Sequence, residues 1–176
     1  MRDVEARLGT ALAPFQDAVD RMMTIPAIRH TVARVIVAEI GLDMSRFPTA
    51  GHLVSWAGLC PRLDESAGKR RSTRTRRGAP WLKTALVQAA WVAARTRNTY
   101  LHAQFLRLKS RRGPKKAIVA VAASIAHRRV PHPRQRPTYA ELGADYFDRR
   151  SKAQITRRLI KRLEGLGVTV EVRPAA

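Results

Sequence analysis

One segment of the chain combines serine hydroxyls with a high density of cations. Residues 61–78 read PRLDESAGKRRSTRTRRG, so Ser66 and Ser72 lie among arginines. A serine that attacks a phosphodiester must lose its proton, and the charge that develops on the phosphate oxygens requires nearby cations. Arginine suits this task because its guanidinium stays charged and matches phosphate geometry. The segment predicts a phosphate-binding loop in which each serine is a nucleophile, an ordinary loop hydroxyl, or part of a purely electrostatic clamp.

The basic residues form a block rather than a scatter. The chain has 34 Lys and Arg against 13 Asp and Glu, a formal net charge of +21, and residues 66–140 hold 19 of the basic groups with no acidic one. Such a block predicts a polyanionic partner, usually nucleic-acid phosphate, although the run at 107–116 also fits a solvated helix end. The candidate nucleic-acid ligands are Lys69, Arg70, Arg71, Arg74, Arg76, Arg77, Lys83, Arg111, Arg112, Lys115 and Lys116.

Cysteine content and apolar runs exclude several other classes. Cys60 is the single cysteine, and the histidines lack zinc-ligand spacing, which excludes a disulfide scaffold and a zinc finger and predicts no metal site. The N-terminus is charged from Arg2 and lacks the apolar core of a secretory signal. The longest apolar run, at 117–126, is about half of the ~20 residues that a membrane span needs. We therefore expect a cytoplasmic protein with no membrane partner.

The elements that must position this loop begin with a helix over residues 3–23. Its apolar residues recur in steps of four and three, as in a coiled coil, at Leu8, Leu12, Phe15, Val19 and Met22. This stripe of apolar residues, the N-terminal seam, packs either on a partner helix or on the chain's own core. Ile25-Pro26 ends this helix and a second follows over 31–40, a layout that fits a phosphate-binding helix-hairpin-helix or a plain packing corner.

The remaining pattern is mainly α-helical. Helices are expected over 49–57, 80–95, 98–110 and 115–127, the last apolar almost all round and therefore buried. Residues 58–78 show no hydrophobic period and are expected to be a long exposed basic loop. A last helix around 155–163 and a short strand at 168–172 complete the prediction. The expected units are a coiled-coil helix (1–24), a small helical domain (25–127), a basic proline-rich linker (128–138) and a C-terminal helix with a strand (139–176).

Three stretches carry a family resemblance. They contain SWAGLCP, then ESAGKRR, then LGADYFD, in this order, within residues 25–148. This arrangement resembles the carboxyl-terminal transposase domain of the insertion-sequence 110/116/902 family. In that family a RuvC-like amino-terminal domain carries four metal-binding carboxylates (DEDD), and the carboxyl-terminal domain carries a serine that attacks DNA under the guidance of a structured bridge RNA.

The resemblance assigns roles to residues of this chain. It implies that Ser66, in the ESAG segment, is the nucleophile, with Ser72 as the alternative, and that the surrounding basic side chains hold phosphate. It implies DNA as a partner, bridge RNA as a second one, and an oligomer joined through residues 3–23. Magnesium is expected only in the RuvC-like domain, so that no cofactor is expected in this chain. A bacterial, nucleoid-associated location follows from the same likeness.

The chain also departs from the family pattern. The family hairpin reads close to PGVG, whereas Pro26-Ala27-Ile28-Arg29 stands here, and HRRVPHPRQRP replaces an apolar helical stretch. Because Met1 begins just before the family's linker helix, the sequence predicts a transposase domain without its RuvC-like half, inactive on its own. The alternative is a non-catalytic nucleic-acid-binding or regulatory fragment that associates with full-length transposase.

Overall fold

A computed structural model describes residues 7, 10–129 and 139–172. The fold is mainly α-helical, as predicted, with one small two-stranded sheet in the described part. The helices are α2 (Gln16–Met23), α3 (His30–Ile40), α4 (Ala50–Trp56), α5 (Pro80–Arg95), α6 (Tyr100–Arg112), α7 (Pro114–Arg129) and α8 (Tyr146–Glu164). Two short 3-10 helices, η1 (Ala13–Phe15) and η2 (Met44–Arg46), and the strands β1 (Asp64–Ser66) and β2 (Lys69–Ser72) complete the description.

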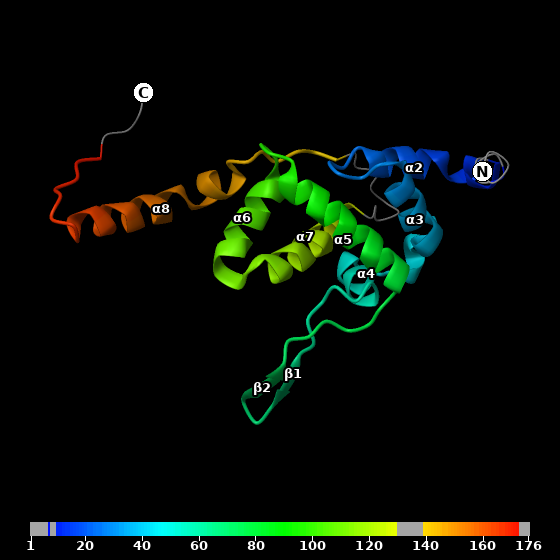
Figure 1. Ribbon diagram of the computed structural model, residues 1–176, viewed down its shortest axis with the longest axis horizontal. Helices are drawn as coiled ribbons and strands as arrows, with labels where there is room; N and C mark the ends of the chain where they lie inside the picture. The colour runs from blue at the N-terminus through cyan, green and yellow to red at the C-terminus, as the bar shows by residue number, and fades with distance from the viewer. Residues whose placement is uncertain (1–6, 8–9, 130–138, 173–176) are drawn as a thin grey trace.

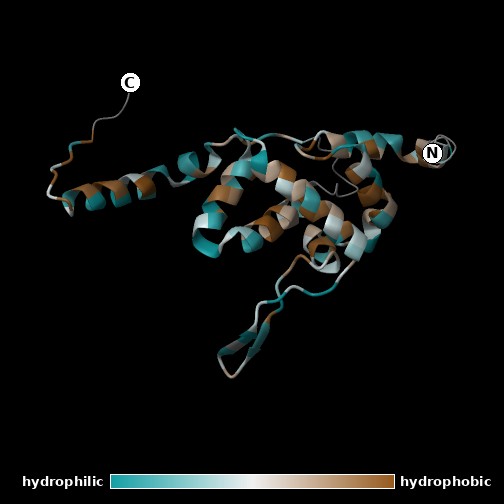
Figure 2. Cartoon of the chain, in the orientation of Figure 1, coloured by the Kyte–Doolittle hydropathy of each residue, from teal (hydrophilic) through white to brown (hydrophobic). Residues whose placement is uncertain are grey.

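The core forms where α5 and α7 pack against each other and against α3, α4 and α6 (Figure 1). Both central helices bury alanines, including Ala90 and Ala93 on α5 and Ala117 and Ala122 on α7. Small side chains let two helix backbones approach closely, so little volume remains to be filled between them. The apolar faces of these helices turn inward (Figure 2). The prediction of a buried helix over 115–127 is confirmed, because no residue from 117 to 126 is exposed.

The N-terminal seam packs on the chain's own body at its C-terminal end. Val19 and Met22 are buried against the core, and α2 contacts α3. Leu12 and Phe15 are half-buried, and Leu8 lies outside the described residues. The seam is not one continuous α-helix, because η1 interrupts it at Pro14, whose ring nitrogen cannot donate a helical hydrogen bond. A partner helix for the first part of the seam stays a prediction.

Two further sequence-based expectations about secondary structure were wrong. The predicted strand is absent from residues 168–172, which have no regular structure, since no strand among the described residues pairs with them. The expected loop over 58–78 contains the β1–β2 hairpin. The proline-rich segment falls largely on residues 130–138, outside the described part, while 128 and 129 belong to the end of α7.

The last helix, α8, extends away from the body (Figure 1). Its base is held by aromatic contacts with Tyr100 of α6. The Tyr100 ring centroid lies 5.1 Å from that of Phe147, with the rings stacked, and 5.2 Å from that of Tyr146, with the rings edge-on. The backbone leaves helical geometry at Ser151, so the distal part turns in a new direction. Within the described residues, no helix combines the length and the apolar content that crossing a membrane would need.

Candidate nucleic-acid interface

The candidate site is a β-hairpin that projects from the helical body (Figure 1). Its strands are antiparallel, and Ser66 pairs with Lys69 across a two-residue turn, Ala67-Gly68. Both turn residues have positive φ, 51° and 71°, the signature of a type I′ turn, whose twist matches that of the flanking strands. Glycine adopts this conformation freely, whereas Ala67 is strained there. The turn places Ser66 at the exposed tip of the hairpin.

The two candidate serines lie at opposite ends of the short sheet. Ser72 pairs with Asp64 at the inner end, is half-buried, and accepts a hydrogen bond from the backbone N–H of Arg74 at 3.2 Å. Ser66 is exposed at the tip beside Lys69. The ladder shifts between these ends, so that Arg71 is an extra residue on β2, and such a bulge redirects the side chains around it. Ser66 is therefore the more accessible hydroxyl of the two.

The hairpin joins the body at a neck where two glycine backbones touch. A Cβ atom on Gly58 would lie 2.6 Å from the carbonyl oxygen of Arg77, and one on Gly78 would meet the backbone nitrogen of Gly58. Both glycines have positive φ, 69° and 63°. The backbone N–H of Arg62 donates to the Arg74 carbonyl at 2.9 Å, which continues the pairing toward the neck. No other residue fits either glycine position without moving backbone.

Lys83, predicted as a phosphate ligand, braces this neck. Its Nζ donates to the hydroxyl of Thr75 at 3.0 Å and to the carbonyl of Arg76 at 3.1 Å. A hydrogen bond from the backbone N–H of Ala79 to the Trp56 carbonyl, at 3.1 Å, ties the same segment to α4. The start of α5 and the end of α4 therefore hold the two arms of the hairpin in a fixed direction.

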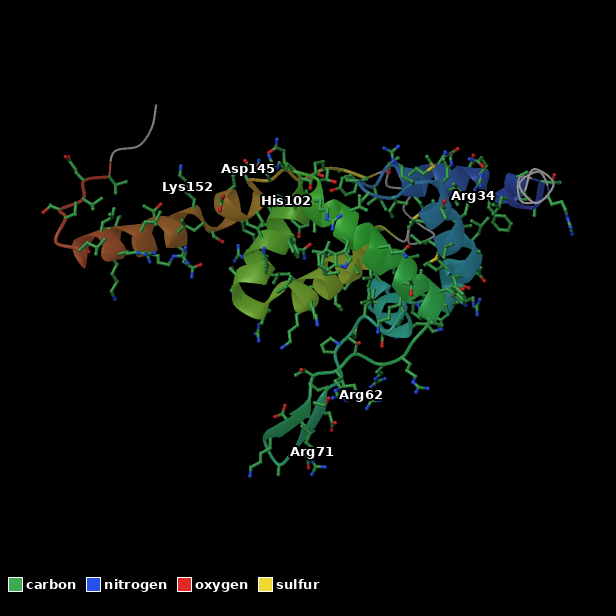
Figure 3. The ribbon with its side chains drawn as sticks, in the orientation of Figure 1. Arg34, Arg62, Arg71, His102, Asp145 and Lys152 are labelled. Atoms are coloured by element: carbon green, nitrogen blue, oxygen red, sulfur yellow. The ribbon has the colours of Figure 1, made fainter. Side chains whose placement is uncertain are left out.

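The cations of the hairpin point to solvent. Among the described side chains, Lys69, Arg71, Arg74, Arg76 and Arg77 are exposed, and none of them forms an ion pair with a carboxylate. Figure 3 shows Arg71 near the tip and Arg62 near the neck, with other nitrogen-bearing side chains between them. For Arg70 the structure describes the backbone alone. A row of unpaired guanidinium groups on a narrow projection is suited to a phosphate backbone.

The other predicted ligands come from a different part of the fold. Arg111 and Arg112 end α6, and Lys115 and Lys116 begin α7, all of them exposed on either side of Gly113. Arg111 also lines a groove of about 660 Å³ between α6 and α8. The hairpin residues are thus brought together with one another, while this second group forms a separate basic turn. Within the part of the chain that the structure describes, no three His, Cys, Asp or Glu side chains gather as metal ligands would.

Sequence reasoning missed two features of this site. The first feature is the β-hairpin. Its turn, Ala67-Gly68, is not one of the Asn-Gly or Asp-Gly dipeptides that predict a hairpin from sequence. The strands beside it are charged on both faces, so they lack the alternation of apolar and polar residues that marks a strand. The second feature is Trp81, which is exposed in the first turn of α5 and belongs to no sequence pattern that predicts a functional role.

Fold and site together define a small, mainly α-helical domain that presents a basic hairpin from one neck, where the backbones of Gly58 and Gly78 meet. The model of the Transposase IS116/IS110/IS902 family matches residues 19–106, half of the chain, and this range includes the whole hairpin. The chain belongs to that family. Comparison with curated proteins finds no match.

Proposed function

We propose that this chain is the serine-bearing, DNA-binding part of a transposase, with the β1–β2 hairpin as its contact to DNA. The observation that carries the proposal is the exposed Ser66 at the tip of a hairpin whose described cations have no ion-pair partner. The family match supports a role in transposition. The hairpin directs both the hydroxyl and the arginines away from the body, where a phosphate backbone can reach them together.

In the proposed step, the Ser66 Oγ–phosphorus bond forms and the bond from phosphorus to one deoxyribose oxygen breaks. The serine proton passes to water, and the released sugar oxygen takes a proton from solvent. The hairpin arginines stabilise the negative charge that builds up on the phosphate oxygens. We further propose that the magnesium-binding carboxylates come from a RuvC-like domain of a full-length transposase in a mixed oligomer, with bridge RNA as the guide.

DNA binding is tested by removing charge from the hairpin. Replacing Arg74, Arg76 and Arg77 by Gln should weaken binding and lower the slope of log affinity against log salt by about two to three, because each lost phosphate contact removes about 0.9. The matched control replaces Arg157, Arg158 and Arg162 of α8 by Gln, which removes the same charge elsewhere. Equal losses in the two variants would contradict a hairpin-specific contact.

The nucleophile is tested by trapping a covalent adduct. With a full-length family member present and labelled donor DNA as substrate, the wild-type chain should acquire a phosphoserine link to DNA. Ser66→Ala should abolish the adduct, while Ser72→Ala should retain it. The opposite result would move the nucleophile to Ser72, and an adduct that survives both changes would remove serine chemistry from this chain.

A further inference from the structure

Trp81 differs from the other two tryptophans of the chain. Trp56 is 40% exposed with its ring 5.4 Å from Phe47, and Trp91 is 41% exposed with its ring 6.3 Å from Phe105. Trp81 is 73% exposed, and among the described residues no aromatic ring packs on it. An indole that is exposed and has no ring packed on it keeps its face open for stacking on a ligand.

The backbone under Trp81 is fixed on both sides. The residue two before it, Ala79, is tied to α4 by its bond to the Trp56 carbonyl, and the residue two after it, Lys83, holds Thr75 and Arg76. Trp81 itself lies in the first turn of α5, directly after Pro80. The indole is therefore presented from a rigid base at the neck, so a ligand that covers it need not first order a loop.

The surroundings of Trp81 identify the chemistry of that ligand. Arg76 and Arg77 are exposed only a few residues earlier, on the arm of the hairpin that leads into α5. Residues 66–140 contain no acidic side chain, and the two carboxylates of the hairpin, Asp64 and Glu65, lie on β1 rather than at the neck. Cations that follow a phosphate backbone beside an aromatic ring are the combination that binds single-stranded nucleic acid, because every base has a face on which an aromatic ring can stack.

We propose that Trp81 stacks on an unpaired base of a single-stranded nucleic-acid segment whose phosphates Arg76 and Arg77 hold at the neck of the hairpin. This inference rests on the proposed function and adds a base contact to its phosphate contacts. It assigns the tip and the neck different tasks, since the tip carries the serine and the neck holds a strand that has left its duplex.

The test compares two strands that differ only in their bases. The probes are oligothymidylate of about 16 nucleotides and a phosphodiester strand of equal length in which every base is absent. Trp81→Ala should weaken binding to oligothymidylate by about 5- to 150-fold, the range that stacking on one base corresponds to. Binding to the strand without bases should be unchanged. Trp81→Phe should restore most of the affinity, and Trp91→Ala, on the same helix, is the matched control with an unchanged affinity.

A second readout observes the indole directly. The double variant Trp56→Phe, Trp91→Phe leaves Trp81 as the single tryptophan, and its fluorescence should be quenched by oligothymidylate and not by the strand without bases. Quenching that instead grows with protein concentration in the absence of nucleic acid would show that another protein chain covers Trp81, and would overturn the proposal.

The two proposals fail in distinguishable ways. One outcome is that Trp81→Ala weakens binding to both strands equally or to neither strand, while the hairpin arginine variant still loses affinity. In that case the proposed stacking by Trp81 is wrong and the proposed phosphate binding by the hairpin stands. If the arginine variant binds normally while Trp81→Ala still loses affinity for the strand with bases alone, the base contact stands and the phosphate contacts of the hairpin are wrong.

Discussion

The hairpin and α8 both leave the helical body and are both basic, yet they are attached by different kinds of contact. The hairpin is joined through backbone, where Gly58 meets Gly78, and through the two hydrogen bonds of Lys83. The base of α8 is joined through side chains, chiefly the ring contacts of Tyr100 with Tyr146 and Phe147.

This difference determines which substitutions each attachment can accept. Ring stacking depends on area and shape, so it accepts another aromatic residue at the same place. A backbone-to-backbone junction leaves no room for any Cβ atom, so it accepts nothing but glycine. The direction of the hairpin is thus specified more strictly than the direction of α8, which agrees with the role proposed for Ser66.

The largest effect is expected from the aromatic base of α8. Tyr100→Ala should lower the free energy of unfolding by about 3–5 kcal/mol, because Tyr100 is only 6% exposed and its loss leaves a cavity between α6 and α8. Urea unfolding followed by circular dichroism measures the change. Tyr100→Phe should lose far less. Where the folded fraction is kept equal, DNA binding by the hairpin should be unaffected, and a loss of binding would show that the two attachments are not independent.

The next effect concerns the glycine junction. Gly78→Ala forces an alanine to a φ of 63° and places its Cβ against the backbone of Gly58. The strained conformation alone costs about 1–3 kcal/mol. Amide hydrogen exchange should show faster exchange at the Arg62 N–H, while protection in α5 and α7 changes little. Gly68→Ala, at a position where a Cβ meets no neighbouring atom, is the control for backbone strain without the clash.

A smaller effect is expected from the lysine brace. Lys83→Met keeps the length of the side chain and removes both hydrogen bonds, which should cost about 1 kcal/mol at the neck. The measurement is hydrogen exchange at the Ala79 and Arg62 amides. Lys115→Met, an exposed lysine of α7, is the matched control. If both variants weaken DNA binding equally without any change in exchange at the neck, Lys83 acts on DNA as a cation, as the sequence had suggested.

The smallest effect is a pH dependence at the base of α8. Burial acts to raise the pKa of Glu141, but hydrogen bonds from the Tyr139 hydroxyl and from the backbone N–H groups of Tyr100, Gly143 and Leu142 outweigh it, so this pKa lies below its usual 4.5. The unfolded chain therefore binds the proton more readily, and the stabilisation by Glu141 is complete above about pH 4.5 and is lost as the pH falls through the lowered value.

This pH dependence of stability is measured by comparing the acid unfolding of the wild type with that of Glu141→Gln. The variant should lose stability at neutral pH and should converge with the wild type in acid, where Glu141 is protonated. A constant difference between the two at every pH would contradict a role for the charged form.

The helices were predictable because the buried face of a helix requires apolar residues that recur every three or four positions in the sequence. Residues 80–95 and 115–127 were expected to be helical from their apolar pattern, and α5 and α7 occupy these ranges to within two residues. The hairpin has no such period, because its arginines face solvent on both sides and its pairing depends on a turn that Ala67 adopts under strain. Ser66 could be chosen by resemblance, but its place at the tip depends on the register of that turn.

Lys83 illustrates the same limit for single residues. Its type and its position in the basic block fit a phosphate ligand, and only the fold reveals the Thr75 hydroxyl and the Arg76 carbonyl beside its ammonium group. The expected strand at 168–172 failed for a related reason, since alternation of valines indicates a strand only where a second strand is available.

Because the hairpin is long, a small rotation at its neck produces a large displacement at its tip. From Pro61, which pairs with Thr75 near the neck, five residues at about 3.3 Å each place Ser66 about 17 Å farther out. A rotation of about 10° at the neck would therefore move the serine by about 3 Å, the length of a hydrogen bond. The stiffness of the contact between Gly58 and Gly78, at the other end of the hairpin, therefore determines how accurately the Ser66 hydroxyl is positioned.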